Sequence, residues 1–295
     1  MSMVQILSGK EVSRKVYSDL TPRIDSLKKQ GIIPGLAVIL VGENPSSKIY
    51  VKSKTRKFES LGLYSKTIYL EDSINESELI TKIRSLNNKK DIHGILIQLP
   101  VPKHIDELKI LQLVNPEKDV DGFHPENVGL LSIGNPRFIS CTPKGIMKIF
   151  DHYDISLDGK YVVVLGRSNI VGRPISLLTS MKEKGANATT TVCHSGTKDI
   201  QDFTSKANIV ISAMGAPGFI KGNMLKNNAV VIDVGINRVE AKNKKGYRLV
   251  GDADWDSIQK KVSAATPVPG GVGPMTIAML VENTVEAAER IVINS

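Results

Sequence analysis

Short apolar runs alternate with longer amphipathic stretches along most of the chain. The first apolar run, residues 35–42, begins and ends with glycine and predicts a buried strand. The stretch before it has apolar residues at helical spacing and predicts a surface helix over about residues 10–30, with Gly31 as its stop. The apolar stripe of this helix consists of Val12, Val16, Leu20, Ile24 and Leu27.

The same alternation continues to about residue 113. A capped helix is predicted after the first strand and ends at Gly62. Two strand–helix pairs follow, with strands at 66–70 and 94–99 and helices near 76–86 and 105–113. Strands that alternate with helices predict a parallel sheet with helices on its faces.

A second alternating series follows a stretch, residues 115–143, that is predicted to be rich in loops. Its predicted strands are YVVVLG (161–166), TTTVC (189–193), NIVISAMG (208–215) and AVVIDVG (229–235). A helix is expected from about Val171 and another before the third strand, which is a Rossmann-like arrangement. A long amphipathic helix from about Met275 to Ile293 closes the chain and could pack back on the first series.

These patterns predict an α/β protein of two domains. The first is a three-layer α/β domain over residues 1–145, with the helix at 275–295 packing back onto it, and the second is a Rossmann-like domain over 146–274. A chain of 295 residues with 41% hydrophobic content can form two modest cores. No window approaches the ~18 consecutive apolar residues of a membrane helix, and the N-terminus lacks a signal sequence, so we expect a cytoplasmic protein without a membrane partner.

The charge balance, +9 from 39 basic and 30 acidic residues, favours anionic partners such as nucleotide phosphates, polycarboxylates or nucleic acid. The basic residues are scattered, and the densest run, residues 242–245, is expected at a hairpin tip. Because aromatic residues make up only 5% and no nucleic-acid reader motif occurs, we expect no nucleic-acid partner. The histidines are unclustered and Cys141 and Cys193 are far apart, so we expect no metal site and two ordinary thiols.

The segment GRSNIVGRP (166–174) leaves a predicted strand and enters a helix, where free backbone N–H groups can bind a phosphate. Its spacing departs from GxGxxG, because Ser168 replaces the second glycine and Gly172 comes one residue late, so a purely structural turn is an alternative. Arg167, together with Ser195 after the next strand, indicates a 2′-phosphate and therefore NADP, since no acidic residue follows that strand.

Polar residues stand where strands of the first domain end. Tyr50 and Lys54 are four residues apart, so they share a helix face that begins at the carboxyl end of a strand. Gln98 lies on an otherwise apolar strand, and Asp121 could accept two hydrogen bonds from an amidine-like ring edge. Each of these residues also has a structural alternative. Tyr50 and Lys54 would then lie on a solvated helix surface, Gln98 would anchor a loop, and Asp121 would belong to an Asp-Gly turn.

The loop TPVPGGVGPMT (266–276) combines three prolines with glycines immediately before the last helix. Such a loop is rigid, and its backbone can approach a flat ligand closely. A simple turn between domains is the alternative.

The sequence resembles the bifunctional methylenetetrahydrofolate dehydrogenase/cyclohydrolase family in five motifs that occur in order across nearly the whole chain. They are VGENPSSKIYVKSK, GILIQLPVP, PEKDVDGFHP, GRSNIVGRP and TPVPGGVGPMT. The resemblance implies NADP-dependent oxidation of 5,10-methylenetetrahydrofolate and hydrolysis of the methenyl product to 10-formyltetrahydrofolate at the same site, in a cleft between two domains. It also implies a homodimer, and the positive charge suits tetrahydrofolate derivatives with polyglutamate tails.

The resemblance also implies roles for particular residues. Lys54 would be the central catalytic residue for proton transfer, Gln98 would hydrogen-bond to it, and Tyr50 would stack on the folate ring. Lys54 can act in this way only if partial burial or nearby cations lower its pKa. Further implied substrate contacts are Asp121, Leu99, Pro100, Pro267, Gly270 and Gly271. Implied cofactor contacts are Gly166, Arg167, Ser168, Ser195 and Ile236.

One departure from the family pattern is GDADW (251–255), which stands where the family commonly reads GDVDF. We expect it only to reshape the edge of the cleft. Two other functions remain open. The first is a monofunctional dehydrogenase, linked to NADP or to NAD, and the presence of both Lys54 and Gln98 argues against it. A nucleotide-sensing or nucleic-acid-binding protein is the second, and it leaves Tyr50 and Asp121 without a role.

Overall fold

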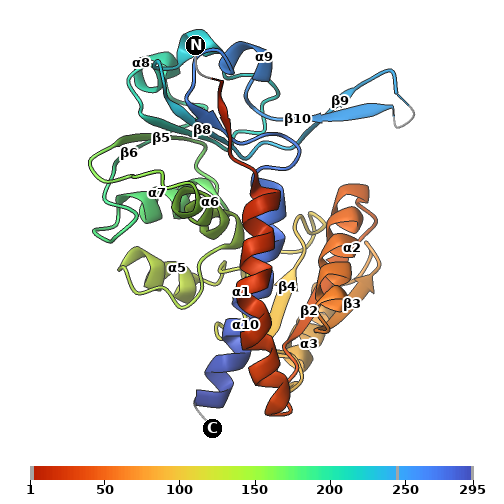
Figure 1. Cartoon of the computed structure of the whole chain (residues 1–295). Coiled ribbons are helices and arrows are strands. Elements are labelled where there is room, and N and C mark those ends of the chain that lie inside the picture. Colours follow the sequence, from red (N-terminus) through yellow and green to blue (C-terminus); the bar gives the residue numbers. More distant parts are fainter. Residues whose placement is uncertain (1–2, 244–245, 294–295) are drawn as a thin grey trace. The chain divides into compact units, whose positions relative to one another are not determined.

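The computed structural model describes residues 3–243 and 246–293 (Figure 1). Residue contacts divide the chain into two units, which we name by their sheets. The three-stranded unit consists of Val16–Cys141 and Ile277–Ser295, and the six-stranded unit consists of Met1–Lys15 and Thr142–Thr276. No helix among the described residues is long and apolar enough to cross a membrane.

The three-stranded unit contains a parallel sheet in the order β3-β2-β4. The strands are β2 (Gly35–Val41), β3 (Tyr64–Leu70) and β4 (Gly94–Ile97). All residues of β2 are buried, as its unbroken apolar run predicts for a strand covered on both faces. In the register, Val38 pairs with Thr67 on one side and with Leu96 on the other.

Helices cover both faces of this sheet. These helices are α2 (Pro45–Ser60), α3 (Glu76–Asn87) and α4 (Glu107–Leu111), whereas α5 (Pro125–Ser132) follows later in the same unit. Helix α3 packs on the face that carries Ile39, whereas Thr55 of α2 bonds to Thr67, whose strand partner Val38 points to the opposite face. This arrangement confirms the predicted α/β layers.

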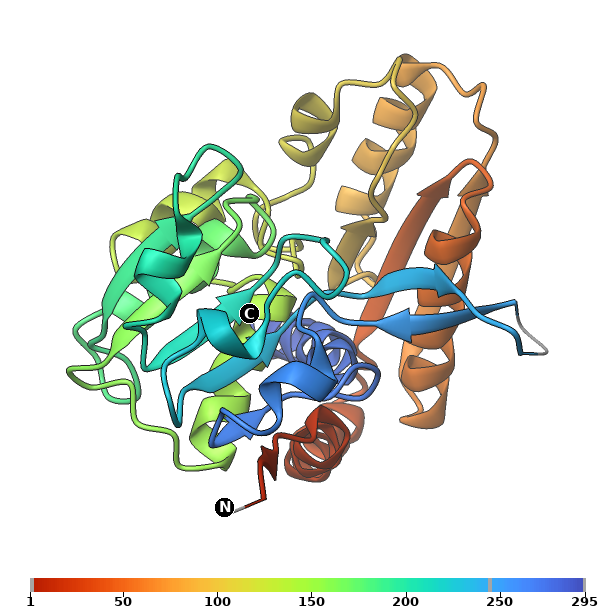
Figure 2. The ribbon, with the colours of Figure 1, turned by 90° about the horizontal axis from the view of Figure 1, so that it is seen from above.

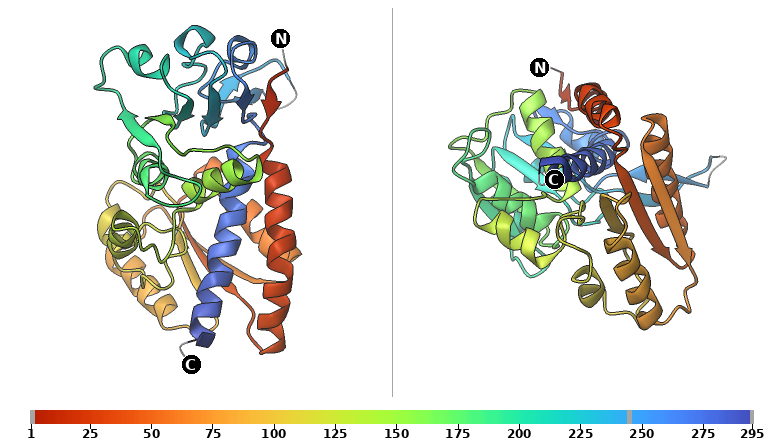
Figure 3. Two further views of the ribbon diagram at one scale, coloured as in Figure 1. Left: turned by 60° about the vertical axis from the view of Figure 1, so that its left-hand side comes forward. Right: turned by 90° about the horizontal axis from the view of Figure 1, so that it is seen from below.

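Two long helices, α1 (Gly9–Lys29) and α10 (Val272–Ile293), contribute residues to both units. Within the three-stranded unit they lie side by side, and Arg23 of α1 forms a 2.6 Å ion pair with Glu289 of α10 (Figure 3). The predicted apolar stripe of α1 is buried throughout. Gly31 ends this helix at φ +76°, where the Ile32 N–H bonds back to the Leu27 carbonyl, which is the expected glycine stop.

The six-stranded unit contains a parallel sheet in the order β1-β11-β8-β7-β5-β6. Its strands are β1 (Gln5–Ile6), β5 (Tyr161–Leu165), β6 (Thr189–Cys193), β7 (Ile209–Ser212), β8 (Val230–Asp233) and β11 (Ala264–Ala265). The chain goes from β5 outward to β6 and then returns to β7 on the other side of β5. This reversal creates the topological switch point at which Rossmann-like sheets bind nucleotides.

Short helices and one hairpin complete the six-stranded unit. The helices are α6 (Cys141–His152), α7 (Gly172–Ser180), α8 (Ile200–Thr204), the 3₁₀ helix η1 (Gly222–Met224) and α9 (Trp255–Ile258). Strands β9 (Asn237–Glu240) and β10 (Tyr247–Val250) form an antiparallel hairpin that extends outward from the sheet (Figure 2). Residues 244–245 of the predicted hairpin tip lie outside the described residues.

The structure corrects one prediction and differs from another. The stretch 115–143 is less loop-rich than predicted, because α5 forms within it and α6 begins at its end. Residues 1–15 belong to the six-stranded unit because β1 pairs with β11, whereas the predicted boundary at 145 places them in the first domain.

Candidate active site

Lys54 lies on α2 and is buried, with 6% of its surface exposed. Helix α2 begins with two sequence signals, an Asn44 side chain that accepts the N–H groups of Ser46 and Ser47 and a proline in its first turn. The Lys54 Nζ donates a 3.0 Å hydrogen bond to Oε1 of Gln98. The predicted pair is therefore in contact, and the alternative of a solvated Lys54 does not hold.

Gln98 follows β4 and is held by its backbone and by its side chain. Its N–H donates to the Ile39 carbonyl at 2.8 Å, which continues the pairing with β2. Its Nε2 donates to the Leu99 carbonyl at 2.9 Å, which turns Oε1 toward Lys54. The amide thus anchors the loop and binds the lysine, so both predicted uses of Gln98 occur together. Leu99 is half-buried and Pro100 is exposed, and a cis peptide bond joins them.

Burial is the main cause that lowers the pKa of Lys54, and Asp121 and Cys141 act in the opposite direction because negative charge on them favours the ammonium form. The half-buried Asp121 shows the converse effect: burial raises the pKa of its carboxyl, while Lys54 and a hydrogen bond from the Cys141 thiol lower it. These three side chains therefore influence one another's charge. Cys141, which we expected to be an ordinary thiol, is therefore a further member of the site.

Asp121 also belongs to a turn, as the alternative predicted. Gly122 has φ +73°, and its N–H bonds to the Asp119 carbonyl at 3.1 Å. The turn and the position of Asp121 near Lys54 are compatible, since the turn uses the backbone and leaves the carboxylate to face Lys54.

Tyr50 lies one turn before Lys54 on α2 and is half-buried. Burial raises the pKa of its phenol, so the ring is neutral at ordinary pH. Lys52, which lies between Tyr50 and Lys54 in the sequence, is exposed. The helix therefore buries Lys54 and leaves Lys52 in solvent.

In the six-stranded unit, the loop after β5 requires glycine at two positions. A Cβ at Gly166, which has φ +118°, would lie 2.4 Å from the Ala213 carbonyl oxygen, and a Cβ at Gly172 would lie 2.2 Å from the Gly166 carbonyl oxygen. Ser168 accepts the N–H groups of Val171 and Gly172 through its hydroxyl, at 3.2 and 3.3 Å. Ser168 therefore stabilises the start of α7. This role explains why a serine can replace the second glycine of the GxGxxG pattern at this position.

Exposed donors follow the ends of β5 and β6. Arg167 and Ser195 are exposed, and the Arg167 guanidinium lies 3.4 Å from Nε2 of His194. The Gly166 N–H bonds to the Cys193 carbonyl, so these two strand ends are adjacent. Since the segment from His194 to Gly196 carries no carboxylate, its chemistry fits a phosphate group better than a ribose 2′-hydroxyl.

The remaining predicted residues also belong to the six-stranded unit. Ile236 follows β8 and is 44% exposed. Gly271 is buried, and a Cβ there would lie 2.6 Å from the Pro267 carbonyl oxygen. The Gly270 carbonyl accepts the Lys10 N–H at 3.2 Å. The PVPGG loop thus packs against the start of α1.

A buried pair of carboxylates, which the sequence analysis missed, supports the loops around Ile236. Asp252 is fully buried and accepts hydrogen bonds from the N–H groups of residues 214–216, the Ser212 hydroxyl and the Asn237 amide, at 2.8 to 3.2 Å. Asp233 accepts the N–H groups of Gly235, Asp252 and Ala253 at 2.8 to 2.9 Å. These bonds tie the loop after β7 to the segment after β8, on the nucleotide-binding edge of the sheet.

The described residues contain no group of three or more His, Cys, Asp or Glu side chains that could hold a metal ion. A Rossmann-like sheet with a glycine turn at its switch point, and a buried lysine bonded to an amide near a carboxylate, define the class of nucleotide-dependent α/β enzymes.

Comparisons with known proteins identify the family. The profile for the tetrahydrofolate dehydrogenase/cyclohydrolase catalytic domain matches residues 7–121, and the profile for the NAD(P)-binding domain of the same family matches residues 140–292. This chain belongs to the tetrahydrofolate dehydrogenase/cyclohydrolase family.

Individual relatives match over the full length. The bifunctional protein FolD of Chlorobium phaeobacteroides (strain BS1) is 49% identical, with 97% of each chain covered. The crystal structure of bifunctional FolD from Campylobacter jejuni has a TM-score of 0.92 at 46% identity, covering 98% of this chain and 99% of that one. The Trypanosoma brucei enzyme, solved with NADP cofactor and inhibitor, has a TM-score of 0.94 at 37% identity and covers 99% of both chains.

These matches confirm the predicted family, the α/β fold with a catalytic and an NAD(P)-binding domain, and an enzyme that acts on tetrahydrofolate derivatives. They favour the bifunctional dehydrogenase/cyclohydrolase over the monofunctional alternative.

Proposed function

We propose that this protein oxidises 5,10-methylenetetrahydrofolate to 5,10-methenyltetrahydrofolate with NADP, hydrolyses the product to 10-formyltetrahydrofolate, and uses Lys54 for the proton transfers of the hydrolysis. The observation that carries the residue assignment is the buried Lys54, bonded to Gln98 and electrostatically coupled to Asp121. The three-stranded unit would supply Lys54, Gln98, Tyr50 and Asp121 for the folate, and the six-stranded unit would bind the cofactor.

The oxidation requires orientation more than acid–base chemistry. NADP supplies the hydride acceptor. The nitrogen lone pairs of the folate stabilise the methenyl cation that remains, so the protein contributes distance and alignment. Tyr50, whose ring is half-buried and neutral, offers a face on which the folate ring can stack. Asp121 can accept hydrogen bonds from the ring N–H and amino groups.

The hydrolysis requires a group that first accepts and then returns a proton. Water adds to the methenyl carbon and loses a proton to the neutral amine of Lys54, which its lowered pKa makes available. The bond from this carbon to N5 then breaks, Lys54 returns its proton to N5, and the hydroxyl loses its own proton as the carbon becomes the formyl group on N10. One proton is released overall, which balances the positive charge of the methenyl cation. Gln98 holds the Lys54 Nζ in place through its carbonyl oxygen.

The cofactor residues are Gly166, Arg167, Ser168, Ser195 and Ile236. Two observations support NADP: exposed Arg167 and Ser195 follow adjacent strand ends with no carboxylate in the segment from His194 to Gly196, and the related Trypanosoma brucei enzyme was solved with NADP. Pro267, Gly270 and Gly271 would line the folate side, together with Leu99 and Pro100.

The first test compares cofactors and then removes the lysine. Purified protein with 5,10-methylenetetrahydrofolate should reduce NADP⁺ in preference to NAD⁺, with little build-up of methenyl intermediate in an absorbance assay. Lys54→Gln should nearly abolish cyclohydrolase activity while NADP binding persists, because Gln cannot exchange the proton. Lys52→Gln, an exposed change on the same helix, is the matched control and should retain both activities. Full hydrolysis by Lys54→Gln would refute the role of the lysine, and no reduction with either cofactor would refute the dehydrogenase.

We further propose that the protein is a homodimer and prefers polyglutamylated folates, for which the net charge of +9 provides electrostatic attraction. Light scattering would give the mass in solution. KM values for mono- and polyglutamylated substrate at low salt would test the second point, and equal values would contradict it. Its cytoplasmic location remains a prediction from the sequence.

A further inference from the structure

Asn283, on the C-terminal helix, is fully buried and contacts the backbone on both sides of the loop that carries Asp121. Its Nδ2 donates to the Val120 carbonyl at 2.8 Å and to the Ile139 carbonyl at 3.0 Å. Because both partners are acceptors, only the amide nitrogen can face them, and this fixes the orientation of the side chain. One amide therefore joins two segments of chain to α10.

These two segments meet next to Asp121. Val120 directly precedes Asp121, and a Cβ on Gly122 would lie 2.8 Å from the Ser140 nitrogen, so the backbones are in close contact. Cys141 adds a second link, since its thiol donates to the Val120 carbonyl oxygen at 3.5 Å and Cys141 lies near enough to Asp121 to lower the pKa of its carboxyl. The Asn283 Nδ2 is 3.9 Å from the same sulfur. Asn283 thus contacts both Val120, which directly precedes Asp121, and Cys141.

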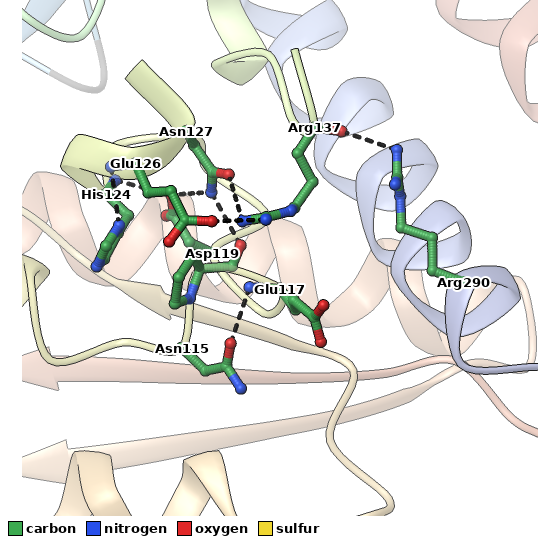
Figure 4. Close-up of polar contacts among 9 residues, drawn as sticks. Asn115, Glu117, Asp119, His124, Glu126, Asn127, Arg137 and Arg290 are labelled. Carbon is green, nitrogen blue, oxygen red and sulfur yellow. Dashed lines mark hydrogen bonds and ion pairs between the residues drawn. The ribbon is translucent and has the colours of Figure 1, made fainter. Parts of the chain in front are cut away.

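The outer part of the loop is held by a network of its own (Figure 4). The buried Asp119 carboxylate accepts the His124 N–H and the Asn127 amide, each at 2.8 Å. Arg137 donates to the Asn127 Oδ1 at 3.2 Å and pairs with Glu126 at 2.6 Å. Because this network keeps the loop internally ordered, loss of Asn283 should shift the base of the loop without unfolding its outer part.

We propose that Asn283 is a positioning residue that holds Asp121 beside Lys54 in the orientation that binds the folate ring. The proposal rests on the proposed function, in which Asp121 orients the folate. Asn283 touches no reacting atom and acts through the backbone at Val120 and through Cys141. Its removal should weaken folate binding and leave cofactor binding unchanged, since the proposed cofactor residues belong to the six-stranded unit.

The experiment uses Asn283→Asp, which removes the N–H donors in nearly the same volume, and Asn283→Ser, which keeps one donor and is the milder change. Thr284→Val is the matched control, because Thr284 is fully buried on the same helix and its hydroxyl bonds within the helix to the Leu280 carbonyl. We measure KM for 5,10-methylenetetrahydrofolate, Kd for NADP and the melting temperature of each variant. KM and Kd do not depend on the amount of folded protein, so a loss of yield does not obscure the result.

The expected result is a folate KM raised by about tenfold or more in Asn283→Asp and by less in Asn283→Ser, with the NADP Kd unchanged. Thr284→Val should lower the melting temperature without raising the folate KM. If Asn283 acts through Asp121, then Asn283→Ser should raise the folate KM much less in an Asp121→Asn background than in the wild-type background.

Two results would overturn the inference. The first is an unchanged folate KM in both Asn283 variants, while Asp121→Asn alone raises it. The second is an equal rise of folate KM in the Thr284 control at the same loss of melting temperature. If Asp121→Asn alone leaves the folate KM unchanged, then the proposed role of Asp121 is wrong, and the fault lies in the proposed function.

Discussion

Asp233 should make the stability of the protein depend on pH in the opposite sense to an ordinary surface carboxylate. Its side chain is buried at the end of β8 and accepts backbone N–H groups of Gly235, Asp252 and Ala253. Burial, with the charge of Asp252 nearby, raises the pKa of Asp233 from 3.8 to about 6 despite those hydrogen bonds. The folded protein therefore keeps a proton that the unfolded chain has already released.

The sign and size of the effect follow from this difference in pKa. The stabilisation from the bound proton is fully present below about pH 3.8 and is lost as the pH rises through about 6. The full difference amounts to about 3 kcal/mol, at 1.36 kcal/mol for each unit. Between about pH 7.5 and about pH 5, the wild-type protein should gain about 1.4 kcal/mol from this group.

The assay is urea unfolding of the wild type and of Asp233→Asn at several pH values from about 5 to about 7.5. The variant cannot titrate, so the wild-type stability minus the variant stability should become more positive by about 1.4 kcal/mol at the lower pH. Asp254→Asn is the control, because Lys221 lowers the pKa of Asp254 below 3.8 through a 2.7 Å ion pair, so that the wild-type minus Asp254→Asn difference should stay constant across this pH range. A wild-type minus Asp233→Asn difference that stays constant across the range would refute the reasoning.

Two further changes test the nucleotide loop. Arg167→Ala should raise KM for NADP⁺ by about 10- to 100-fold and leave KM for NAD⁺ nearly unchanged, because only NADP has the 2′-phosphate. Arg173→Ala is the kinetic control, since Arg173 is an exposed arginine on α7. Equal losses for both cofactors in Arg167→Ala would contradict the assignment. Gly166→Ala should lower the melting temperature more than Gly185→Ala does, because both glycines have positive φ but only a Cβ at Gly166 meets a backbone oxygen, at 2.4 Å. Equal melting temperatures for these two variants would show that the loop accommodates a Cβ at Gly166 without loss of stability.

The elements with strong periodicity could be predicted from the sequence. Strand β2 is buried on both faces and therefore reads as one apolar run, and α1 shows its buried stripe at helical spacing. A glycine at the end of α1 and another at the end of α2 added a local signal, since Gly31 and Gly62 both have positive φ there. Local sequence was sufficient in these cases because local geometry determines them.

Elements that depend on distant contacts were missed or misplaced. Helix α5 is short, and tertiary contacts of Asn127, which donates to Asp119 and to the Pro116 carbonyl, hold it in place. Strand β1 is exposed and exists because it pairs with β11, some 259 positions away in the register of Gln5 with Ala264. No local pattern reports such a partner, so the boundary near residue 15 could not be read from the sequence.

The same distinction applies to the site. Lys54 and Gln98 could be proposed together because a helix face and a strand end both lie at the carboxyl edge of one sheet. Asn283 and Val120 are 163 residues apart, and neither lies in a pattern that names the other. The lowered pKa of Lys54 could be stated only as a requirement, because burial of an amine is a property of the packed structure.

The departure at GDADW has a physical explanation in the buried acidic pair. The family pattern GDVDF has aspartates at the positions of Asp252 and Asp254 in this chain. The two motifs differ only at Ala253 and Trp255. The contribution of Ala253 to the pair is its backbone N–H, which donates to Asp233 at 2.8 Å and which any residue except proline supplies. Trp255 begins α9 and packs against the apolar core of the six-stranded unit, a place that any large aromatic can fill. The carboxylate of Asp252, by contrast, accepts hydrogen bonds from Ser212, from the N–H groups of residues 214–216 and from Asn237 at once, and no other side chain of that length offers two acceptor oxygens. Substitutions in this motif should therefore be tolerated where the backbone makes the contact and not at Asp252.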